Sequence, residues 1–258
     1  MYSDLRSWAS PIRNQGSCGS CTAFGTIGAW EPYLRIKENN KSYPIDLSER
    51  DLFSCAGGSC LFGSQMKPIL NRALEGVCTE ECCPYDAKDH LCSQGCCEEW
   101  WVGAKKLIAW EGVTNTLNMK SILDTVPLIT TMAVHQSFMN YKSGVYHSLE
   151  NDPVIGYHCI AVLGYSDELG AWLIRNSWGI GWGMEGYAWV KYSDSEIDKE
   201  MYRIIPDGEI PPEPKPPIPS PCKLGNFIAK LINLIAKLFR RKGRFYYLNK
   251  FSHSFFYL

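Results

Sequence analysis

A cysteine stands where a glycine-containing loop gives way to a helical pattern. The loop runs from Gln15 to Cys21, and the apolar residues after it repeat at a spacing that predicts one buried helix face: Ala23, Ile27, Trp30 and Leu34. Cys21 is therefore expected at or just inside a helix N-terminus, where free backbone N–H groups and the helix dipole favour a thiolate. A lone cysteine in that position is more often a structural cap, so the assignment depends on partner residues.

A candidate partner histidine and its orienting residue lie well downstream of Cys21. His158 precedes an apolar run, 159–163, that predicts a buried strand, and a second apolar run, 172–174, follows hairpin-type residues. The second run ends at Asn176. A hairpin would make His158 and Asn176 neighbours, so that the amide could orient the imidazole and Trp178 could cover their hydrogen bond. A thiolate requires such a base, which later protonates the leaving amine.

The motifs, in this order, resemble those of the papain-like cysteine peptidases over roughly residues 4–205. The resemblance is carried by segments 11–21, 47–55, 137–146, 158–165 and 176–187. It implies an α+β fold of two lobes, a helical N-terminal lobe and a β-barrel-like C-terminal lobe, with a peptide bound in the cleft between them. It also implies a cysteine-type endopeptidase that forms an acyl-enzyme and needs no cofactor or metal.

The resemblance assigns a role to each matching residue. Cys21 is the expected nucleophile, His158 its imidazolium partner, and Asn176 the residue that orients His158. Gln15 is the expected oxyanion donor, together with the backbone N–H of Cys21. The family often has Trp directly after the nucleophile, and this chain has Thr22.

The substrate cleft shows a second departure. The family's Cys-Asn-Gly-Gly segment is Cys60-Leu-Phe-Gly-Ser64 here, and only Gly63 matches its second glycine. Phe62 stands where close backbone approach is usual, so it narrows the cleft or forms an aromatic wall, and substrate preference cannot be transferred. Tyr157 and Trp178 are assigned to the cleft with Gly63 and Phe62.

The chain contains twelve cysteines, which favours a secreted or a lysosome- or vacuole-like oxidising compartment. The resemblance implies the bridges Cys18–Cys60 and Cys55–Cys92, and Cys159 is expected to remain a free apolar thiol. The repeat CxxxCC occurs at 78–83 and at 92–97. Disulfides are favoured there over a zinc site for two reasons. Zn²⁺ sites usually contain CxxC pairs, which the repeat lacks, and Cys55 and Cys92 are already assigned to a bridge. The partners of the other cysteines stay open.

The same residues disfavour three alternatives to the endopeptidase. An exopeptidase of this fold would block the cleft with a histidine-bearing loop, but the cysteine-bounded segment here holds only His90. A catalytically inactive peptide-binding relative is disfavoured because all four expected catalytic residues are present. The Asn-Ser-Trp-Gly block argues against a Cys-His hydrolase or transferase of another fold.

The sequence divides into a peptidase domain at 1–205, a Pro-rich linker at 206–222 and a basic, amphipathic and aromatic tail at 223–258. The formal net charge of −1 gives no reason to expect a nucleic acid partner. Eight of the 26 Lys and Arg residues and none of the 27 Asp and Glu residues lie in the tail. The tail is predicted to form an amphipathic helix that is too short to span a bilayer and that binds an anionic membrane surface, docks on the core or self-associates. Neither a signal peptide nor a propeptide is visible, which suggests a processed product or a member without a prosegment.

Overall fold

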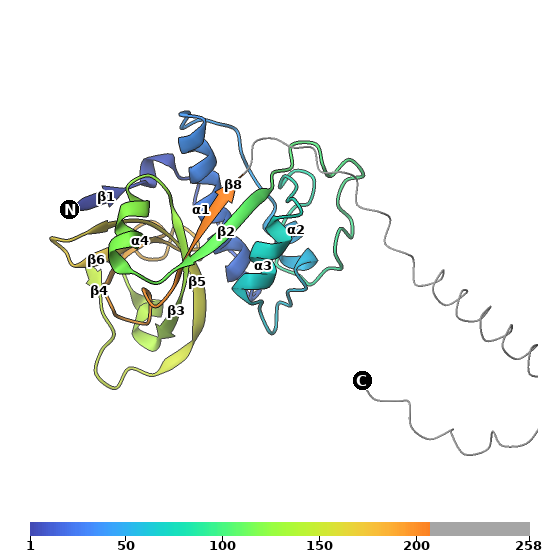
Figure 1. The fold of residues 1–258 in the computed structure, drawn as a ribbon. Coiled ribbons are helices and arrows are strands. Elements are labelled where there is room, and N and C mark those ends of the chain that lie inside the picture. The colour runs from blue at the N-terminus through green and yellow to red at the C-terminus, as the bar shows by residue number, and fades with distance from the viewer. Residues whose placement is uncertain (207–258) are drawn as a thin grey trace, which may run out of the picture. The chain divides into compact units, whose positions relative to one another are not determined.

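The computed structural model describes residues 1–206 (Figure 1). The expected linker beyond Pro206 and the expected tail, 223–258, lie outside the described residues. The α-helices are α1 (Cys21–Lys37), α2 (Glu49–Cys55), α3 (Met66–Ala73) and α4 (Thr116–Leu123), with 3-10 turns at Arg6–Trp8 and Gln136–Asn140. The strands are β1 (Tyr2–Asp4), β2 (Leu107–Val113), β3 (Leu128–His135), β4 (Val145–Tyr146), β5 (Val154–Ser166), β6 (Ala171–Arg175), β7 (Tyr187–Lys191) and β8 (Met201–Pro206).

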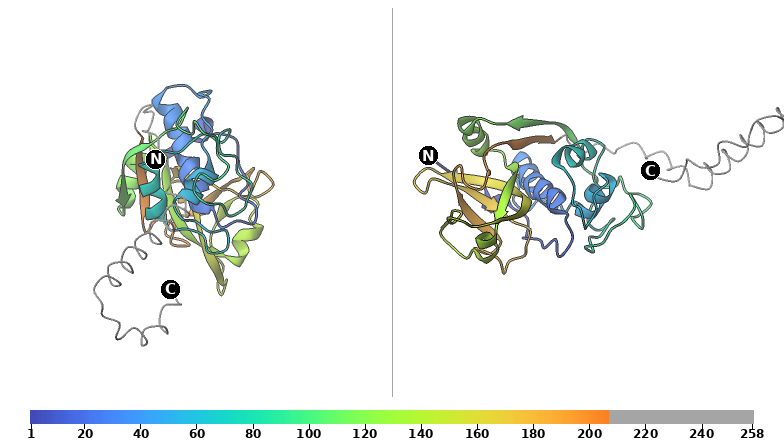
Figure 2. Two further views of the ribbon diagram at one scale, coloured as in Figure 1. Left: turned by 90° about the vertical axis from the view of Figure 1, so that its right-hand side faces the viewer. Right: turned by 90° about the horizontal axis from the view of Figure 1, so that it is seen from below.

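Helix α1 lies between the sheet and the two shorter helices α2 and α3 (Figures 1 and 2). It begins at Cys21, as the sequence predicted, with Ser20 as its N-cap residue. Its apolar face is buried, but so are most of its other residues from Thr22 to Leu34. A helix buried on several sides makes a rigid support for the residue at its N-terminus.

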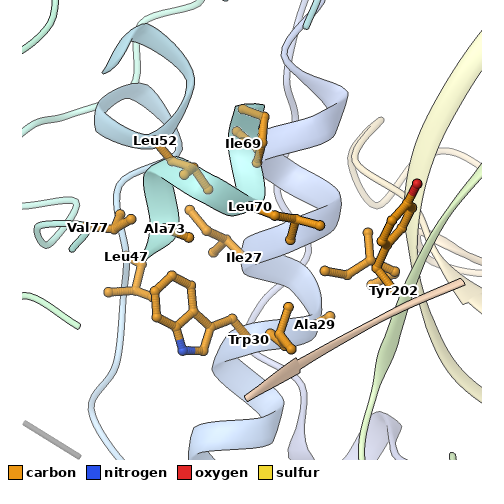
Figure 3. Close-up of a cluster of buried hydrophobic side chains, with 14 of the residues drawn as sticks. Ile27, Ala29, Trp30, Leu47, Leu52, Ile69, Leu70, Ala73, Val77 and Tyr202 are labelled. Atoms are coloured by element: carbon orange, nitrogen blue, oxygen red, sulfur yellow. The ribbon is translucent and has the colours of Figure 1, made fainter. Parts of the chain in front are cut away.

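The helical lobe comprises α1, α2 and α3, which share one apolar core (Figure 3). Trp30 of α1 packs there with Leu47, and α3 contributes Ile69 and Leu70. The predicted cap of α2 is confirmed, since the Ser48 side chain accepts a hydrogen bond from the backbone N–H of Asp51. These contacts anchor α1 from the side opposite the sheet.

The described strands form one eight-stranded sheet in the order β2-β8-β3-β5-β6-β7-β4, with β1 paired to β5. The predicted hairpin is confirmed: β5 and β6 are antiparallel, and Ser166 pairs with Ala171. The expected barrel-like closure is not made by strand pairing among the described residues, because the end strands are β2 and the two-residue β4, which pair only with β8 and β7. The α+β content and the two-lobe arrangement agree with the resemblance.

Glycine allows α1 to approach β5 closely. A Cβ atom added at Gly25 would lie 2.6 Å from the sulfur of Cys159 and 3.1 Å from the backbone nitrogen of Ile160. Such distances are well inside van der Waals contact, so a side chain at Gly25 would push the helix off the strand. The glycine therefore brings the first turn of α1 against the part of β5 that begins at His158.

Four disulfides tie the helical lobe together. Cys18–Cys60 and Cys55–Cys92 confirm the pairing that the resemblance implied. The repeat also forms disulfides, Cys82–Cys97 and Cys83–Cys96, as favoured over zinc. In the described chain Cys159 is a free buried thiol, as expected, and Cys78 is another. The expectation of disulfide-bonded cysteines is confirmed.

None of the helices at residues 1–206 combines the length and apolar character that a membrane crossing requires.

Candidate active site

The sulfur of Cys21 lies against the strand that carries His158. It is within hydrogen-bonding reach of the backbone N–H of Cys159 on β5 and of Thr22 in its own helical turn. Cys159 directly follows His158. The N-terminal end of α1 and the start of the buried part of β5 therefore meet at the Cys21 sulfur. Among the three free cysteines of residues 1–206, Cys21 is the only one that is not fully buried.

His158 and Asn176 are brought together by the β5–β6 hairpin. The imidazole Nε2 and the Asn176 Oδ1 are 2.7 Å apart. The backbone N–H of Ser177 also donates to Asn176 Oδ1, at 2.7 Å. Because a backbone N–H can only donate, this bond fixes the amide orientation and makes Nε2 of His158 the donor toward Oδ1. The Nδ1 atom is then left without a proton in the neutral ring, and it can act as a base.

Trp178 covers the histidine, as the sequence predicted. Its ring stacks on the imidazole with centroids 4.6 Å apart and an angle of 30° between the planes. His158 is 5% exposed and Asn176 is 2% exposed. An apolar cover of this kind keeps water from competing for the His158–Asn176 hydrogen bond.

The Gln15 side chain is held on both sides. Its Nε2 donates to the carbonyl of Cys18 at 2.9 Å, and its Oε1 accepts from the Ser177 hydroxyl at 2.6 Å. Its backbone N–H donates to the carbonyl of Ser177 at 2.9 Å. Since Nε2 carries two hydrogens, the amide is fixed in place and retains one further donor. The same segment, 176–177, thus orients both His158 and Gln15.

The sequence analysis missed Ser177 and Tyr85 as supporting residues. The Tyr85 hydroxyl donates to the carbonyl of Gln15 at 2.8 Å and lies 2.6 Å from the hydroxyl of Ser20. Its ring meets Phe24 edge to face at 4.8 Å. Ser177 was part of a quoted motif, so a signal for it existed. Nothing local marked Tyr85, which is 70 residues from Gln15.

Burial opposes charge on each half of the pair. Burial raises the pKa of the Cys21 thiol, and the N–H groups of Cys159 and Thr22 counteract part of that rise. Burial lowers the pKa of His158 to about 4, and its hydrogen bond to Asn176 opposes the shift. A thiolate or an imidazolium alone is therefore disfavoured here.

The expected cleft residues lie in two exposed groups. Gly63 closes a tight hairpin with Ser59, and Phe62 at its tip is 87% exposed. The backbone N–H of Gly19 donates to the carbonyl of Cys60, which joins this hairpin to the loop before the nucleophile. On the other side, Tyr157 is 66% exposed and precedes His158 on β5.

Tyr157 lies on β5, and Thr22, which stands where the family often has Trp, lies on α1. Residues 157 and 159 share one face of the strand, and the sulfur of Cys159 contacts Met66 of the helical lobe. Thr22 is buried, and its hydroxyl has no hydrogen-bond partner among the described residues.

The described histidines other than His158 are engaged elsewhere. His90 contacts Asp86 through Nε2 at 2.7 Å and Arg50 through Nδ1 at 3.2 Å. Nδ1 of His135 lies 2.9 Å from the carbonyl oxygen of Asp152. His158 alone among the described histidines has an asparagine partner and directly precedes the residue whose backbone N–H the Cys21 sulfur reaches.

Comparison with known proteins places these residues in a family. The model of the papain family cysteine protease matches residues 2–205. Cysteine proteinase 3 of Solanum lycopersicum is 35% identical over 194 residues, 69% of this chain and 51% of the relative. Digestive cysteine proteinase 1 of Homarus americanus is 33% identical over 69% of this chain and 57% of the relative, and cathepsin J of Rattus norvegicus is 30% identical over 70% and 56%. The chain thus spans about half the length of the curated relatives it matches. This protein belongs to the papain family of cysteine proteases.

Proposed function

We propose that this protein is a cysteine-type endopeptidase that hydrolyses peptide bonds in peptides or proteins through a thiolate–imidazolium pair. The observation that carries the proposal is a helix N-terminal thiol within hydrogen-bonding reach of the backbone N–H of Cys159, the residue after an imidazole whose tautomer Asn176 fixes. Gln15, held by Ser177 and Cys18, supplies a donor next to the same thiol.

The proposed reaction begins with proton transfer from Cys21 to Nδ1 of His158. The thiolate attacks the carbonyl carbon of the scissile bond, and the oxyanion accepts hydrogen bonds from Gln15 Nε2 and the backbone N–H of Cys21. The imidazolium then gives its proton to the leaving amine, and a thioester to Cys21 remains. Water, activated by the neutral imidazole, hydrolyses the thioester and restores the thiol.

The two charges of the resting pair stabilise each other. Because burial alone opposes both, the thiolate and the imidazolium form together, when one proton moves from sulfur to nitrogen. The N–H groups of Cys159 and Thr22 and the N-terminal dipole of α1 add to the attraction from the imidazolium.

This pairing predicts how His158 titrates. In a Cys21→Ala variant the imidazole should show a pKa near 4, because burial then acts without a thiolate partner. Folding would favour the neutral ring, so the free energy of unfolding should fall as the pH is lowered from 6.5 toward 4. In the unchanged protein the thiolate should hold the pKa of His158 above that of the variant. Imidazole NMR signals followed against pH measure both values, and equal values would contradict the ion pair.

Endopeptidase action is proposed over exopeptidase action because of His90. An exopeptidase loop of this fold presents a histidine to a substrate terminus, but both ring nitrogens of His90 face Asp86 and Arg50. Peptides blocked at both ends should therefore be cleaved as readily as free ones. Cleavage of free-ended peptides alone would favour the exopeptidase.

The catalytic assignment is tested by covalent labelling. Within residues 1–206, an epoxide that reacts with activated thiols should modify the unchanged protein at Cys21 alone, because Cys78 and Cys159 are buried and burial raises their pKa values. The same residues should remain unlabelled in the Cys21→Ala variant. Mass spectrometry of fragments reports the site, and labelling at another cysteine of residues 1–206 in place of Cys21 would contradict the assignment.

We further propose that Phe62 and Tyr157 form apolar walls on opposite sides of the cleft. Both are exposed aromatic residues, one beside the loop at Gly19 and the other beside His158. Exposed rings of this size gain free energy by covering an apolar substrate side chain. The four disulfides also support action in an oxidising compartment.

Replacing Phe62 by glycine should reduce kcat/KM about 5- to 30-fold for peptides with a bulky apolar residue before the scissile bond. Peptides with small residues there should change less than about 3-fold. A peptide-library cleavage profile measures the difference. Ile108→Ala, at an exposed position on β2, is the matched control. An unchanged profile in Phe62→Gly would contradict the aromatic wall.

A further inference from the structure

The amide of Asn176 faces two environments. Its Oδ1 accepts hydrogen bonds from His158 and from the backbone N–H of Ser177. Its Nδ2 is fully buried and has no hydrogen-bond partner among the described residues. A buried amide donor without a partner destabilises the folded state. The orphaned donor belongs to the residue that holds the proposed base in place.

A small internal cavity lies at this amide. The volume open to the centre of a water molecule is about 10 Å³, which is about the minimum for one water. Its polar lining includes Glu49, Arg13 and Arg175, together with Asn176 and Ser177. A polar cavity of this size favours an ordered water, whereas an apolar one stays dry.

The lining provides acceptors as well as donors. Glu49 is 4% exposed, and its side chain makes no ion pair within the described chain. Gly28 also lines the cavity. Its carbonyl oxygen has no helical donor, because the residue four positions later is Pro32, which has no N–H. A water that accepts from Asn176 Nδ2 needs such acceptors for its own two hydrogens.

The two arginines are already occupied. Arg175 donates to the hydroxyl of Ser10 at 3.0 Å and to the carbonyl of Pro11 at 2.7 Å, and Arg13 forms an ion pair with Asp46. A guanidinium has no acceptor, so neither arginine can satisfy the amide donor of Asn176 directly. Of the charged side chains around the cavity, only Glu49 can accept a hydrogen bond from a bound water.

We propose that this cavity holds one water molecule that accepts a hydrogen bond from Asn176 Nδ2 and donates to the Glu49 carboxyl group. Glu49 is then a positioning residue: it fixes Asn176 through the water, and Asn176 fixes the tautomer and orientation of His158. The water site stands on the geometry alone, and only its effect on turnover depends on the proposed peptidase function. The water also satisfies a donor that hydrogen bonds to the described residues leave unpaired.

The water is tested first without any turnover, in the full-length chain with Cys21→Ala. An NMR cross-peak between the side-chain NH₂ of Asn176 and a slowly exchanging water is expected. It should persist in Glu49→Gln, which keeps an acceptor of similar size, and disappear in Glu49→Leu. Ser10→Ala is the matched control: it removes a buried contact of Arg175 outside the cavity, so it should lower the melting temperature and leave the cross-peak intact.

Turnover is measured in the same variants with Cys21 present. Glu49→Leu should lower kcat about 10-fold with KM within about 2-fold, because a mobile Asn176 misplaces His158. Glu49→Gln should restore kcat to within about 3-fold of the unchanged protein. Absence of the cross-peak in the parent, or its survival in Glu49→Leu, would overturn the water site. If the Cys21→Ala parent shows the cross-peak but the unchanged protein cleaves no peptide, the water site stands and the peptidase proposal is refuted.

Discussion

Replacing Cys21 by alanine is expected to lower kcat for peptide hydrolysis on the order of 10⁶-fold, to the level left by substrate binding and the oxyanion donors. The loss is large because the proposed thioester forms on this sulfur, and no other free thiol of residues 1–206 is accessible enough to replace it. The other free thiols of residues 1–206, Cys78 and Cys159, are buried, and burial raises their pKa values. Initial rates on a fluorogenic peptide measure the effect.

Two controls separate chemistry from folding in that experiment. Cys21→Ala should melt within a few degrees of the unchanged protein, because Cys21 is a helix N-terminal residue whose side chain is half-buried. Cys78→Ser, which alters a free thiol distant in sequence from the site, should retain hydrolysis even where it lowers stability. Hydrolysis that persists in Cys21→Ala at more than about one-thousandth of the original rate would exclude the thiol mechanism.

Replacing Gln15 by alanine is expected to lower kcat about 10²- to 10³-fold, the loss typical of one oxyanion donor. The effect should appear mainly in kcat, since the donor meets negative charge only in the transition state. The geometry supports this assignment: Oε1 is held by the Ser177 hydroxyl at 2.6 Å, so Nε2 cannot rotate away from the loop of Cys18.

A second substitution sharpens this prediction. Gln15→Glu keeps the shape of the side chain and removes both amide hydrogens, so it should lose at least as much kcat as Gln15→Ala. A purely structural role would predict the reverse order, with the isosteric variant the more active. Steady-state kcat and KM on one peptide decide between the two readings, and a change below about 3-fold in both variants would remove Gln15 from the mechanism.

The parts of the site that follow from local sequence were predictable. The spacing of Ala23, Ile27, Trp30 and Leu34 located α1 and its first residue, Cys21. Hairpin residues between two apolar runs placed His158 next to Asn176. Both inferences need only a repeat of side-chain pattern and a short turn, which a single sequence contains.

The supporting contacts were not predictable, because they join residues far apart in the chain. Ser177 lies 162 residues from Gln15, and Tyr85 lies 70 residues from it. Glu49 meets the cavity beside Asn176 only once α2 has packed near β6. The CxxxCC repeat identified the cysteines but not their disulfide connectivity. The sheet is open because its end strands do not pair, and the end strand β4 is too short to be read from the sequence.

The nested bridges Cys82–Cys97 and Cys83–Cys96 have a consequence for resistance to proteolysis. They lie on both sides of a surface segment that would otherwise be a long, exposed loop, and a third bridge, Cys55–Cys92, pins its middle to α2. A peptidase must draw several consecutive residues of its target into an extended form before it can cut them. A segment fastened by these bridges cannot be drawn out in this way, so we expect it to resist proteolysis until a reductant opens the bridges.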